Sequence, residues 1–417
     1  MPDADLRLPD TWSQKRLGEV ALRVMVGIAS AATHAYRPSG VVLLRNLNIK
    51  PGRIADDDLL FIDPEYEKQH ARKRLIAGDV ITVRTGDPGV SAVVPKRYEG
   101  AQCFTSLITR PNPALITGDY LCMFINSRDG QRQILNGQAG GAQQNVNAST
   151  LEKLVVVVPS LSEQRAITAL LGQWDKAVGH VVRLVRARRK LKRGLLQQLL
   201  TGERRFPEFR DQPWERLPLG ELLQEQERHV EWSDDAIYRL VSVRRRSGGF
   251  FDRERRLGRD ILTKSLKETH AGDFVLARMQ VLHGAMTVTP LAFHGAHVSD
   301  SYMTFVARVR SRLHMPYLGY LSTTREMYYK AFRSSFGVAI EKMTFQPRWW
   351  LNETVYLPSS IEEQRRITDV FESLDREIQI LTDLHEALKE QKKGLMQQLL
   401  TGKVRVPASM LKETAHA

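Results

Sequence analysis

The stretch GLLQQLLTG, residues 194–202, returns almost unchanged as GLMQQLLTG at residues 394–402. The match extends at the same offset of 200 positions: residues 163–207 and 363–407 share 19 identities in 45 positions without a gap. Solenoid repeats have periods of about 20 to 50 residues, far shorter than this one. Each repeat is therefore predicted to be a domain-sized unit with a core of its own.

The repeat continues upstream and divides the chain into blocks and tails. WSQKRLGEV begins at Trp12 and WERLPLGEL at Trp214, so each copied tail follows a block that opens with Trp and then Leu-Gly-Glu. The 417 residues are thus predicted to form two globular blocks, each followed by a long helix. The predicted ranges are block one at 1–158, a central long helix at 159–206, block two at 207–357, a C-terminal long helix at 358–407 and a tail at 408–417.

Composition narrows the class of protein. Hydrophobic residues make up 42% of the chain, which is enough to fill two cores, and the formal net charge is +14. A strong positive charge favours a polyanionic partner such as nucleic acid, although a basic surface kept for solubility is the alternative. The two cysteines, Cys103 and Cys122, make a disulfide framework or a thiolate zinc site improbable. The polar start MPDADLRLPD and the lack of a long apolar run favour a cytoplasmic protein.

Both tails show the periodicity of paired helices. Each begins after Pro-Ser, with Ser162 or Ser360 ahead of a Glu-Gln pair, and each reaches a glycine stop at Gly202 or Gly402. Heptads counted from Ile167 place apolar residues on one stripe, which indicates a coiled-coil seam. The residues predicted to pair the helices and contact a partner are Ile167, Leu170, Trp174, Val181, Leu184, Leu191 and Leu195, together with Ile367, Phe371, Leu374, Leu381, Leu388 and Leu395.

The charges of the two tails differ. Residues 163–205 contain eleven Lys or Arg against three Asp or Glu, whereas residues 363–405 contain eight of each. This difference favours antiparallel pairing of the two helices in a pseudo-twofold repeat, with acids of the second offsetting arginines of the first. The alternative is two independent helices, each lying on its own block.

The blocks share a skeleton of hairpins and short helices. AGDVITVRTGDPGVSAVV from Ala77 and AGDFVLARMQVLHGAMTVT from Ala271 alternate apolar and polar residues on both sides of a loop, which predicts a hairpin in each block. YLCMFINS and YLGYLSTTREMYYKAF predict helices that precede a final strand. The fold class is therefore α+β: two mixed α/β domains with a curved sheet, separated by two long antiparallel coiled-coil helices.

Between these shared elements lie basic and amide-rich loops that differ between the blocks. Block two contains RLVSVRRRSGGFFDRERRLGR, which has eight arginines in 21 residues. Arginine suits guanine edges and phosphates, and glutamine or asparagine suits adenine, so these loops are the predicted DNA contacts. The candidates in block one are Arg45, Lys50, Arg53, Arg72, Lys73, Arg74, Arg84, Thr85, Lys96, Arg97, Gln143, Gln144 and Asn145. Those in block two are Arg244, Arg245, Arg246, Arg253, Arg255, Arg256, Arg278, Gln280 and His283.

A search for catalytic motifs finds none that is convincing. The chain has no phosphate-binding loop of the Walker type, no dinucleotide fingerprint and no Asn-Pro-Pro-aromatic motif of an amino-methyltransferase. His294 and His297 lie in a loop without carboxylate or cysteine partners at ligand spacing, so no metal site is predicted. No catalytic residue is assigned.

The duplicated blocks, VPSLSEQRAIT, LPSSIEEQRRIT and the two QQLLTG ends strongly resemble the specificity subunit of type I restriction-modification systems. The resemblance covers essentially the whole chain. It implies that the blocks are target recognition domains, each reading one half of a bipartite DNA site, and that residues 163–202 and 363–402 are the family's two helical regions. ARMQVLHGAM in block two departs from the Arg/Thr-Gly loop of block one, so base contacts are not transferred to it.

The resemblance also implies partners. Two methyltransferase subunits would supply S-adenosylmethionine and modify adenine, and restriction/translocase subunits would use ATP and Mg to cleave unmodified DNA. This chain would bind no cofactor and would itself be non-catalytic. The competing hypothesis is a DNA-binding scaffold of another defence or chromosome-organising complex. A self-sufficient nuclease or methyltransferase would need catalytic residues that the sequence does not show.

Overall fold

The computed structural model describes residues 8–30, 32–137, 145–338 and 343–413. The chain forms two compact units, and each unit is built from both repeats. Unit 1 comprises Met1–Val182 and Asp383–Ala417, and unit 2 comprises Arg183–Thr382. Each unit therefore contains one block, the beginning of the helix that follows this block, and the end of the helix from the other repeat.

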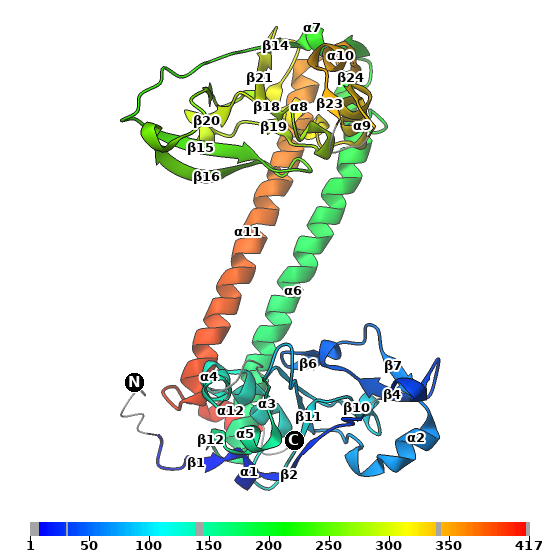
Figure 1. The fold of residues 1–417 in the computed structure, drawn as a ribbon, viewed down its shortest axis with the longest axis vertical. Coiled ribbons are helices and arrows are strands. Elements are labelled where there is room, and N and C mark those ends of the chain that lie inside the picture. Colours follow the sequence, from blue (N-terminus) through cyan, green and yellow to red (C-terminus); the bar gives the residue numbers. More distant parts are fainter. Residues whose placement is uncertain (1–7, 31, 138–144, 339–342, 414–417) are drawn as a thin grey trace. The chain divides into compact units, whose positions relative to one another are not determined.

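Two long helices, α6 (Leu161–Leu199) and α11 (Ile361–Leu400), correspond to the repeated tails (Figure 1). At the start of each helix a serine hydroxyl caps the backbone: Ser160 Oγ accepts from Glu163 N at 3.3 Å, and Ser360 Oγ accepts from Glu363 N at 3.4 Å. Beyond the helix ends, Gly202 has φ of 74° in the left-handed region that glycine adopts without strain.

Within each unit the two helices run antiparallel, and equivalent residues pair. In unit 1, Lys392 Nζ lies 2.5 Å from Asp175 Oδ1, and in unit 2, Lys192 Nζ lies 2.5 Å from Asp375 Oδ1. The repeat offset of 200 thus relates the two ion pairs residue by residue. The predicted fold class, with two long antiparallel helices in a tandem repeat, is confirmed.

The buried seam of α6 contains every seventh residue counted from Ile167, as predicted, but its intervening positions lie one residue later than predicted. Residues 167, 171, 174, 178, 181, 185, 188, 192, 195 and 199 are buried or half-buried, with steps that alternate between four and three residues. Leu184 and Leu191, predicted to pair the helices or to contact a partner, are 38% and 44% exposed and lie outside the buried seam, so partner contact stays a prediction for them. Val185 and Lys192 occupy the seam instead.

Lys192 is the reason that the apolar pattern of α6 predicts a different seam residue from the one observed. An apolar leucine one residue earlier fits a hydrophobic stripe better than a lysine does. In the structure the stem of Lys192 is covered while its ammonium reaches Asp375 and lies 5.0 Å from the Tyr320 ring. The Tyr320 hydroxyl donates to Asp375 Oδ2 at 2.9 Å, so the seam position is polar but satisfied. A polar residue at such a position specifies the register of the pairing.

The block of unit 1 contains two four-stranded sheets. The main sheet has the order β2-β11-β8-β9, and the second sheet has the order β10-β4-β7-β3. The main sheet's strands are β2 (Ala21–Val26), β11 (Leu107–Pro111), β8 (Val80–Thr82) and β9 (Ser91–Val93), and the second sheet's strands are β10 (Gln102–Cys103), β4 (Val41–Leu44), β7 (Leu60–Ile62) and β3 (Tyr36–Arg37). The other elements are β1 (Ser13–Arg16), α1 (Leu17–Val20), β5 (Ile49–Lys50), β6 (Arg53–Ile54), α2 (Pro64–Gln69), α3 (Gly118–Asn126), α4 (Arg128–Asn136), α5 (Ala148–Glu152), β12 (Val155–Val158) and α12 (Ala408–Glu413).

The block of unit 2 repeats the main sheet and alters the second. Its main sheet, β14-β21-β18-β19, has the same order of equivalent strands, whereas its second sheet is β16-β15-β20-β17. The strands are β14 (Leu223–Glu225), β21 (Tyr302–Ala307), β18 (Phe274–Ala277), β19 (Met286–Val288), β16 (Phe250–Leu257), β15 (Ile237–Val243), β20 (Ala296–Ser299) and β17 (Leu266–Thr269). The other elements are β13 (Trp214–Pro218), α7 (Leu219–Leu222), α8 (Met315–Leu321), α9 (Arg325–Arg333), β22 (Ser335–Phe336), β23 (Thr344–Phe345), α10 (Pro347–Asn352) and β24 (Thr354–Pro358).

The two predicted hairpins are confirmed as β8–β9 and β18–β19, both antiparallel. The single helix predicted for block two from YLGYLSTTREMYYKAF is split into α8 and α9, just as α3 and α4 follow each other in block one. In unit 2 the core formed by Phe274, Phe305 and Trp350 extends to Phe371 of α11 and Leu199 of α6. The main sheet therefore packs through its helices onto the long-helix pair.

The repeated Glu-Gln pair lies where block and helices meet. In unit 2, Glu363 accepts hydrogen bonds from Arg205, at 3.0 and 2.7 Å, and from the Trp214 indole, at 3.3 Å. The neighbouring Gln364 accepts from the backbone N–H of His314 at 2.8 Å.

Unit 1 forms the same contacts. Glu163 accepts from Arg405 at 2.8 Å and from the Trp12 indole at 3.0 Å, and Gln164 accepts from Thr117 N at 2.8 Å. The repeated Trp, Glu-Gln and Arg motifs are thus one structural junction that occurs twice, and each junction joins residues of both repeats.

Candidate nucleic-acid interface

Several of the basic residues predicted to bind DNA in unit 1 are held by other residues of the unit. Arg74 forms a two-pronged ion pair with the nearly buried Glu67, at 2.7 and 2.6 Å, and this arginine lowers the pKa of the Glu67 carboxyl. Arg45 Nη2 donates to Asp58 Oδ2 at 2.7 Å, and Lys73 Nζ donates to a backbone carbonyl at 2.8 Å. These three side chains stabilise the block, so their sequence-based assignment as DNA contacts finds no support in their geometry.

Other cations of unit 1 remain exposed. Lys50, Arg53, Arg72 and Lys96 form no ion pair or side-chain hydrogen bond with the described part of the chain. Lys50 and Arg53 face each other across the β5–β6 hairpin, so their two positive charges lie side by side. Arg97 differs, because its guanidinium lies 3.1 Å from Asp56 and stacks over a tyrosine ring.

The β8–β9 loop of unit 1 is braced by its neighbours. Asn46 Nδ2 donates to the carbonyl and hydroxyl oxygens of Thr85, both at 3.1 Å. The carbonyl of the half-buried Arg84 accepts from Val146 N at 3.1 Å, which places the half-buried Asn145 beside this loop. The predicted contacts Gln143 and Gln144 lie outside the described residues.

In unit 2 the arginine-rich loop between β15 and β16 packs against the β18–β19 hairpin. Arg246 and Ser247 have φ of 56° and 51°, an uncommon conformation for residues other than glycine. Arg246 N donates to the carbonyl of His283 at 2.6 Å, and Ser247 N donates to the carbonyl of Gly284 at 2.7 Å. The fold thus brings together two loops that the sequence analysis selected separately.

The arginine side chains of this loop differ in their freedom. Arg245 Nε donates to Gln280 Oε1 at 2.8 Å, and Arg244 stacks over the Phe251 ring at 4.6 Å. The exposed side chains of Arg246 and Arg278 form no ion pair or hydrogen bond with the described residues. Arg246 and Arg278 are therefore available to an anionic ligand.

Strands β15 and β16 form the longest two-stranded ribbon of the second sheet (Figure 1). Arg253 and Arg255 lie on the edge strand β16, and Arg253 is the residue at which the pairing with β15 shifts register. Both are exposed and unpaired among the described residues. Arg256 instead pairs with Glu254 at 2.8 Å. A two-stranded ribbon is narrow enough to enter the major groove of DNA.

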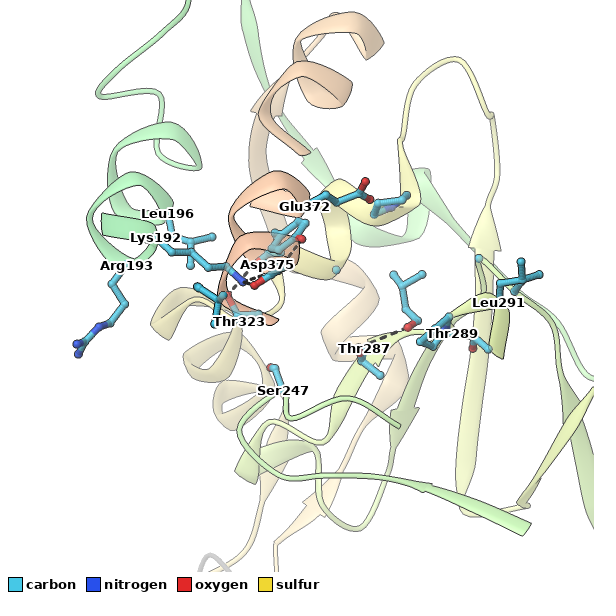
Figure 2. Close-up of a pocket in the computed structure, with 18 of the residues that line it drawn as sticks. Lys192, Arg193, Leu196, Ser247, Thr287, Thr289, Leu291, Thr323, Glu372 and Asp375 are labelled. Atoms are coloured by element: carbon cyan, nitrogen blue, oxygen red, sulfur yellow. Dashed lines mark hydrogen bonds and ion pairs between the residues drawn. The ribbon is translucent and has the colours of Figure 1, made fainter. Parts of the chain in front are cut away.

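A cavity of about 1030 Å³ in unit 2 separates α6 from the main sheet (Figure 2). Its walls include Arg189, Lys192 and Arg193 of α6, Ser247 of the arginine-rich loop, and Thr287 and Thr289 at the end of β19. Figure 2 shows Lys192 turned towards Asp375, while Arg193 points away from it. Sequence analysis missed this cavity because its walls come from segments far apart in the chain.

The His, Cys, Asp and Glu side chains that the structure describes form neither a metal-binding cluster nor a reactive thiol. Among the described residues, no group of three or more His, Cys, Asp or Glu side chains is placed to hold a metal ion. His294 Nδ1 accepts from Ala271 N at 3.2 Å, and His294 stacks on His270. Burial raises the pKa of the Cys103 and Cys122 thiols to about 12, so neither is a thiolate near neutral pH.

Within the described ranges, the helices lack any stretch with the length and apolar character of a membrane span.

No protein-family model matches the chain, but individual relatives do. A protein of Methanocaldococcus jannaschii assigned as the MjaX specificity subunit of a type I restriction enzyme is 22% identical over 429 residues, covering 96% of this chain and 95% of the relative. The MjaVIII specificity subunit from the same organism is 24% identical over 280 residues, covering 63% of this chain and 65% of the relative.

Solved structures show the same fold. The HsdS subunit from Thermoanaerobacter tengcongensis aligns with a TM-score of 0.53 and 20% identity, covering 97% of this chain and 100% of that one. The S subunit of a type I restriction-modification system from M. genitalium aligns with a TM-score of 0.55 and 13% identity, covering 95% and 97%.

The chain is similar over its whole length to type I restriction enzyme specificity subunits. The resemblance predicted from the repeated motifs is therefore confirmed. As a specificity-subunit fold, the chain has two blocks with a common main sheet, and exposed cations lie outside that sheet on the β5–β6 hairpin, the arginine-rich loop and the β15–β16 ribbon, among other places.

Proposed function

We propose that this chain is the sequence-specific DNA-binding subunit of a type I restriction-modification complex. Each block reads one half of a bipartite target, and the chain directs adenine methylation or cleavage by its partners. The observation that carries the proposal is the double junction. The same Trp, Glu-Gln and Arg contacts support two blocks whose main sheets agree in strand order and whose second sheets and basic loops differ.

Such an arrangement suits a reader of two different half-sites. The common main sheet and junction attach each block to the long helices in the same way. The loops that differ between the blocks supply two separate sets of hydrogen-bond donors for DNA. Unpaired cations on both blocks provide phosphate and base contacts. We propose two methyltransferase subunits and restriction/translocase subunits as partners. S-adenosylmethionine, ATP and Mg would be bound by those partners, and this chain would contribute recognition without catalysis in the cytoplasm.

Co-expression with the adenine methyltransferase subunit proposed as its partner tests the proposal. We expect adenine methylation at one bipartite motif, made of two specific halves and a nonspecific gap, when the methylome is mapped. Neither protein alone should produce that motif. Methyl transfer by the purified chain alone with S-adenosylmethionine, or a methylated motif that is the same without the chain, would contradict the proposal.

The exposed arginines of β16 lead to a prediction about single contacts with DNA. The double change Arg253→Ala and Arg255→Ala should weaken binding to the cognate duplex by about 1 to 3 kcal/mol for each base contact that is lost. If the two arginines contact only phosphates, the dependence of DNA affinity on salt concentration should become weaker, and the recognised sequence should stay the same. Fluorescence anisotropy with the assembled complex measures both.

A charge-matched control uses Arg256→Ala with Arg259→Ala. These arginines pair with Glu254 and Asp235, so their loss removes the same charge from residues already engaged. The control should bind DNA more tightly than the β16 double variant. Equal losses would show that only net charge matters on this ribbon.

A further inference from the structure

The C-terminal half of α6 has four cations that lie outside its seam with α11. Arg186, Arg189, Lys190 and Arg193 follow one another at helical spacing, so they share one face. All four are exposed, and none forms an ion pair, hydrogen bond or ring contact with the described part of the chain. Lys192, in the seam, instead pairs with Asp375. These four residues are here named the cationic face of α6.

The equivalent face of α11 is neutral. Its residues at the same repeat positions are Glu386, Lys389, Glu390 and Lys393. Lys389 Nζ lies 3.0 Å from Glu386 Oε2, which lowers the pKa of that carboxyl, and Lys393 Nζ lies 3.7 Å from Glu390 Oε2. The same fold is therefore compatible with a face that carries no net charge.

The cationic face is costly for the helix itself. Like charges three or four residues apart destabilise a helix, whereas the alternating charges on α11 stabilise it. The two helices have 39 and 40 residues, equivalent serine caps and equivalent ion pairs between them, so neither folding nor pairing requires four unpaired cations on α6. The difference between the repeats points to an anionic ligand.

The surroundings in unit 2 favour DNA as that ligand. Arg189 and Arg193 line the cavity, whose other walls contain Ser247, beside Arg246, and Thr289 (Figure 2). Two carboxylates of α11, Glu372 and Asp375, also line it, and Asp375 is paired with Lys192. The Thr289 hydroxyl is buried, with the residue 2% exposed, and has no hydrogen-bond partner among the described residues. The cationic face is thus continuous, across the cavity, with the arginine-rich loop proposed to contact DNA.

We propose that the cationic face of α6 binds the sugar-phosphate backbone of duplex DNA, beside the bases read by block two. This inference rests on the proposed function and extends it from the blocks to a long helix. The four residues span about 10 Å of helix at about 1.5 Å per residue, while a duplex carries one charge per about 1.7 Å of its axis. Several phosphates are therefore within reach of one face. These contacts add affinity and orientation but no sequence information.

The test replaces the cationic face with the charge pattern of α11. Arg186→Glu with Lys190→Glu creates the residues found at 386 and 390, and glutamate keeps helix propensity. Binding of the full chain to a mixed-sequence duplex is measured by anisotropy at about 0.05 to 0.2 M salt. Loss of two phosphate contacts should reduce the slope of log affinity against log salt concentration by about 1.8. At about 0.1 M salt this corresponds to a loss of affinity of about sixty-fold.

A transposed variant controls for net charge. It combines Arg186→Glu and Lys190→Glu with Glu386→Arg and Glu390→Lys, so the chain keeps its formal charge of +14. We expect this variant to show the same reduced slope, because the position of the charges decides the contact. A slope restored to that of the unchanged chain would overturn the inference. Circular dichroism should show unchanged helix content in both variants.

The outcomes separate this inference from the proposed function. If the unchanged chain directs methylation but the α6 variant binds duplex with an unchanged slope, the inference fails and the function stands. If the unchanged chain fails to bind duplex at about 0.05 M salt, both fail. If the variant no longer co-purifies with the methyltransferase, while DNA affinity is unchanged, the face binds an acidic protein surface and the inference is overturned.

Discussion

Exchange of residues 212–357 for the corresponding block of a related chain is expected to change one half of the methylated sequence completely and leave the other half intact. The physical reason is the junction. Trp214, at the start of the block, and Glu363, at the start of α11, form the same contacts as their counterparts in unit 1. A block that retains this tryptophan and the apolar residues facing α6 and α11 should pack normally and bring its own loops.

The measurement is a methylome of cells that express the exchanged chain with its methyltransferase. The reciprocal exchange of residues 12–158 is the matched control and should alter the other half of the motif. A change in both halves, or in neither, would show that the blocks do not read DNA independently. Loss of all methylation with an intact, folded complex would argue against interchangeable blocks.

The second large effect is expected at the junction of unit 2. Arg205→Ala should destabilise the unit by about 3 to 5 kcal/mol, because a buried carboxylate then loses its charged partner. The Glu363 side chain is only 1% exposed and that of Arg205 only 17%. Arg205 also donates to the carbonyls of Arg210 and Gln212, at 3.1 and 2.8 Å, so it ties the chain after α6 to the start of α11.

Chemical denaturation measures this loss of stability as a lower midpoint of the unfolding transition, with an unchanged dependence of the unfolding free energy on denaturant concentration. Arg216→Ala is the control, since Arg216 is exposed and only stacks on the Tyr356 ring. It should cost less than about 1 kcal/mol. The double change Arg205→Ala with Glu363→Ala should cost less than the sum of the two single changes, because they share one ion pair. Additive costs would mean that the pair contributes nothing to the junction.

The motifs in the sequence predicted much of the fold because they are local. Pro-Ser before Glu-Gln marks the start of a helix, and alternating apolar residues around Gly-Asp turns mark a hairpin. Each of these features depends on residues close together in the chain. The two long helices and both hairpins therefore appear where they were predicted, and the exact repetition of Glu163 as Glu363 predicted two equivalent structures.

The choice of partners could not be predicted in this way. Arg74 and Arg253 are both arginines in basic stretches, yet Arg74 is held by Glu67 and Arg253 is unpaired among the described residues. Likewise, Leu191 fits an apolar stripe better than Lys192 does. Lys192 nevertheless lies in the seam, because its ammonium forms an ion pair with Asp375. Sequence composition does not distinguish an ion-paired arginine from a free one.

The sequence by itself determined that this protein is a duplication with two α+β blocks, two long helices and an excess of positive charge. Spacing, caps and turns act over a few residues, and the repeat is visible as identity at a constant offset. Only the tertiary structure decided that each unit is assembled from both repeats, which cations remain free, and that α6 has a cationic face beside a cavity. Those features depend on which side chains packing brings together, in the junctions residues more than a hundred positions apart and in pairs such as Arg74 and Glu67 residues only a few positions apart.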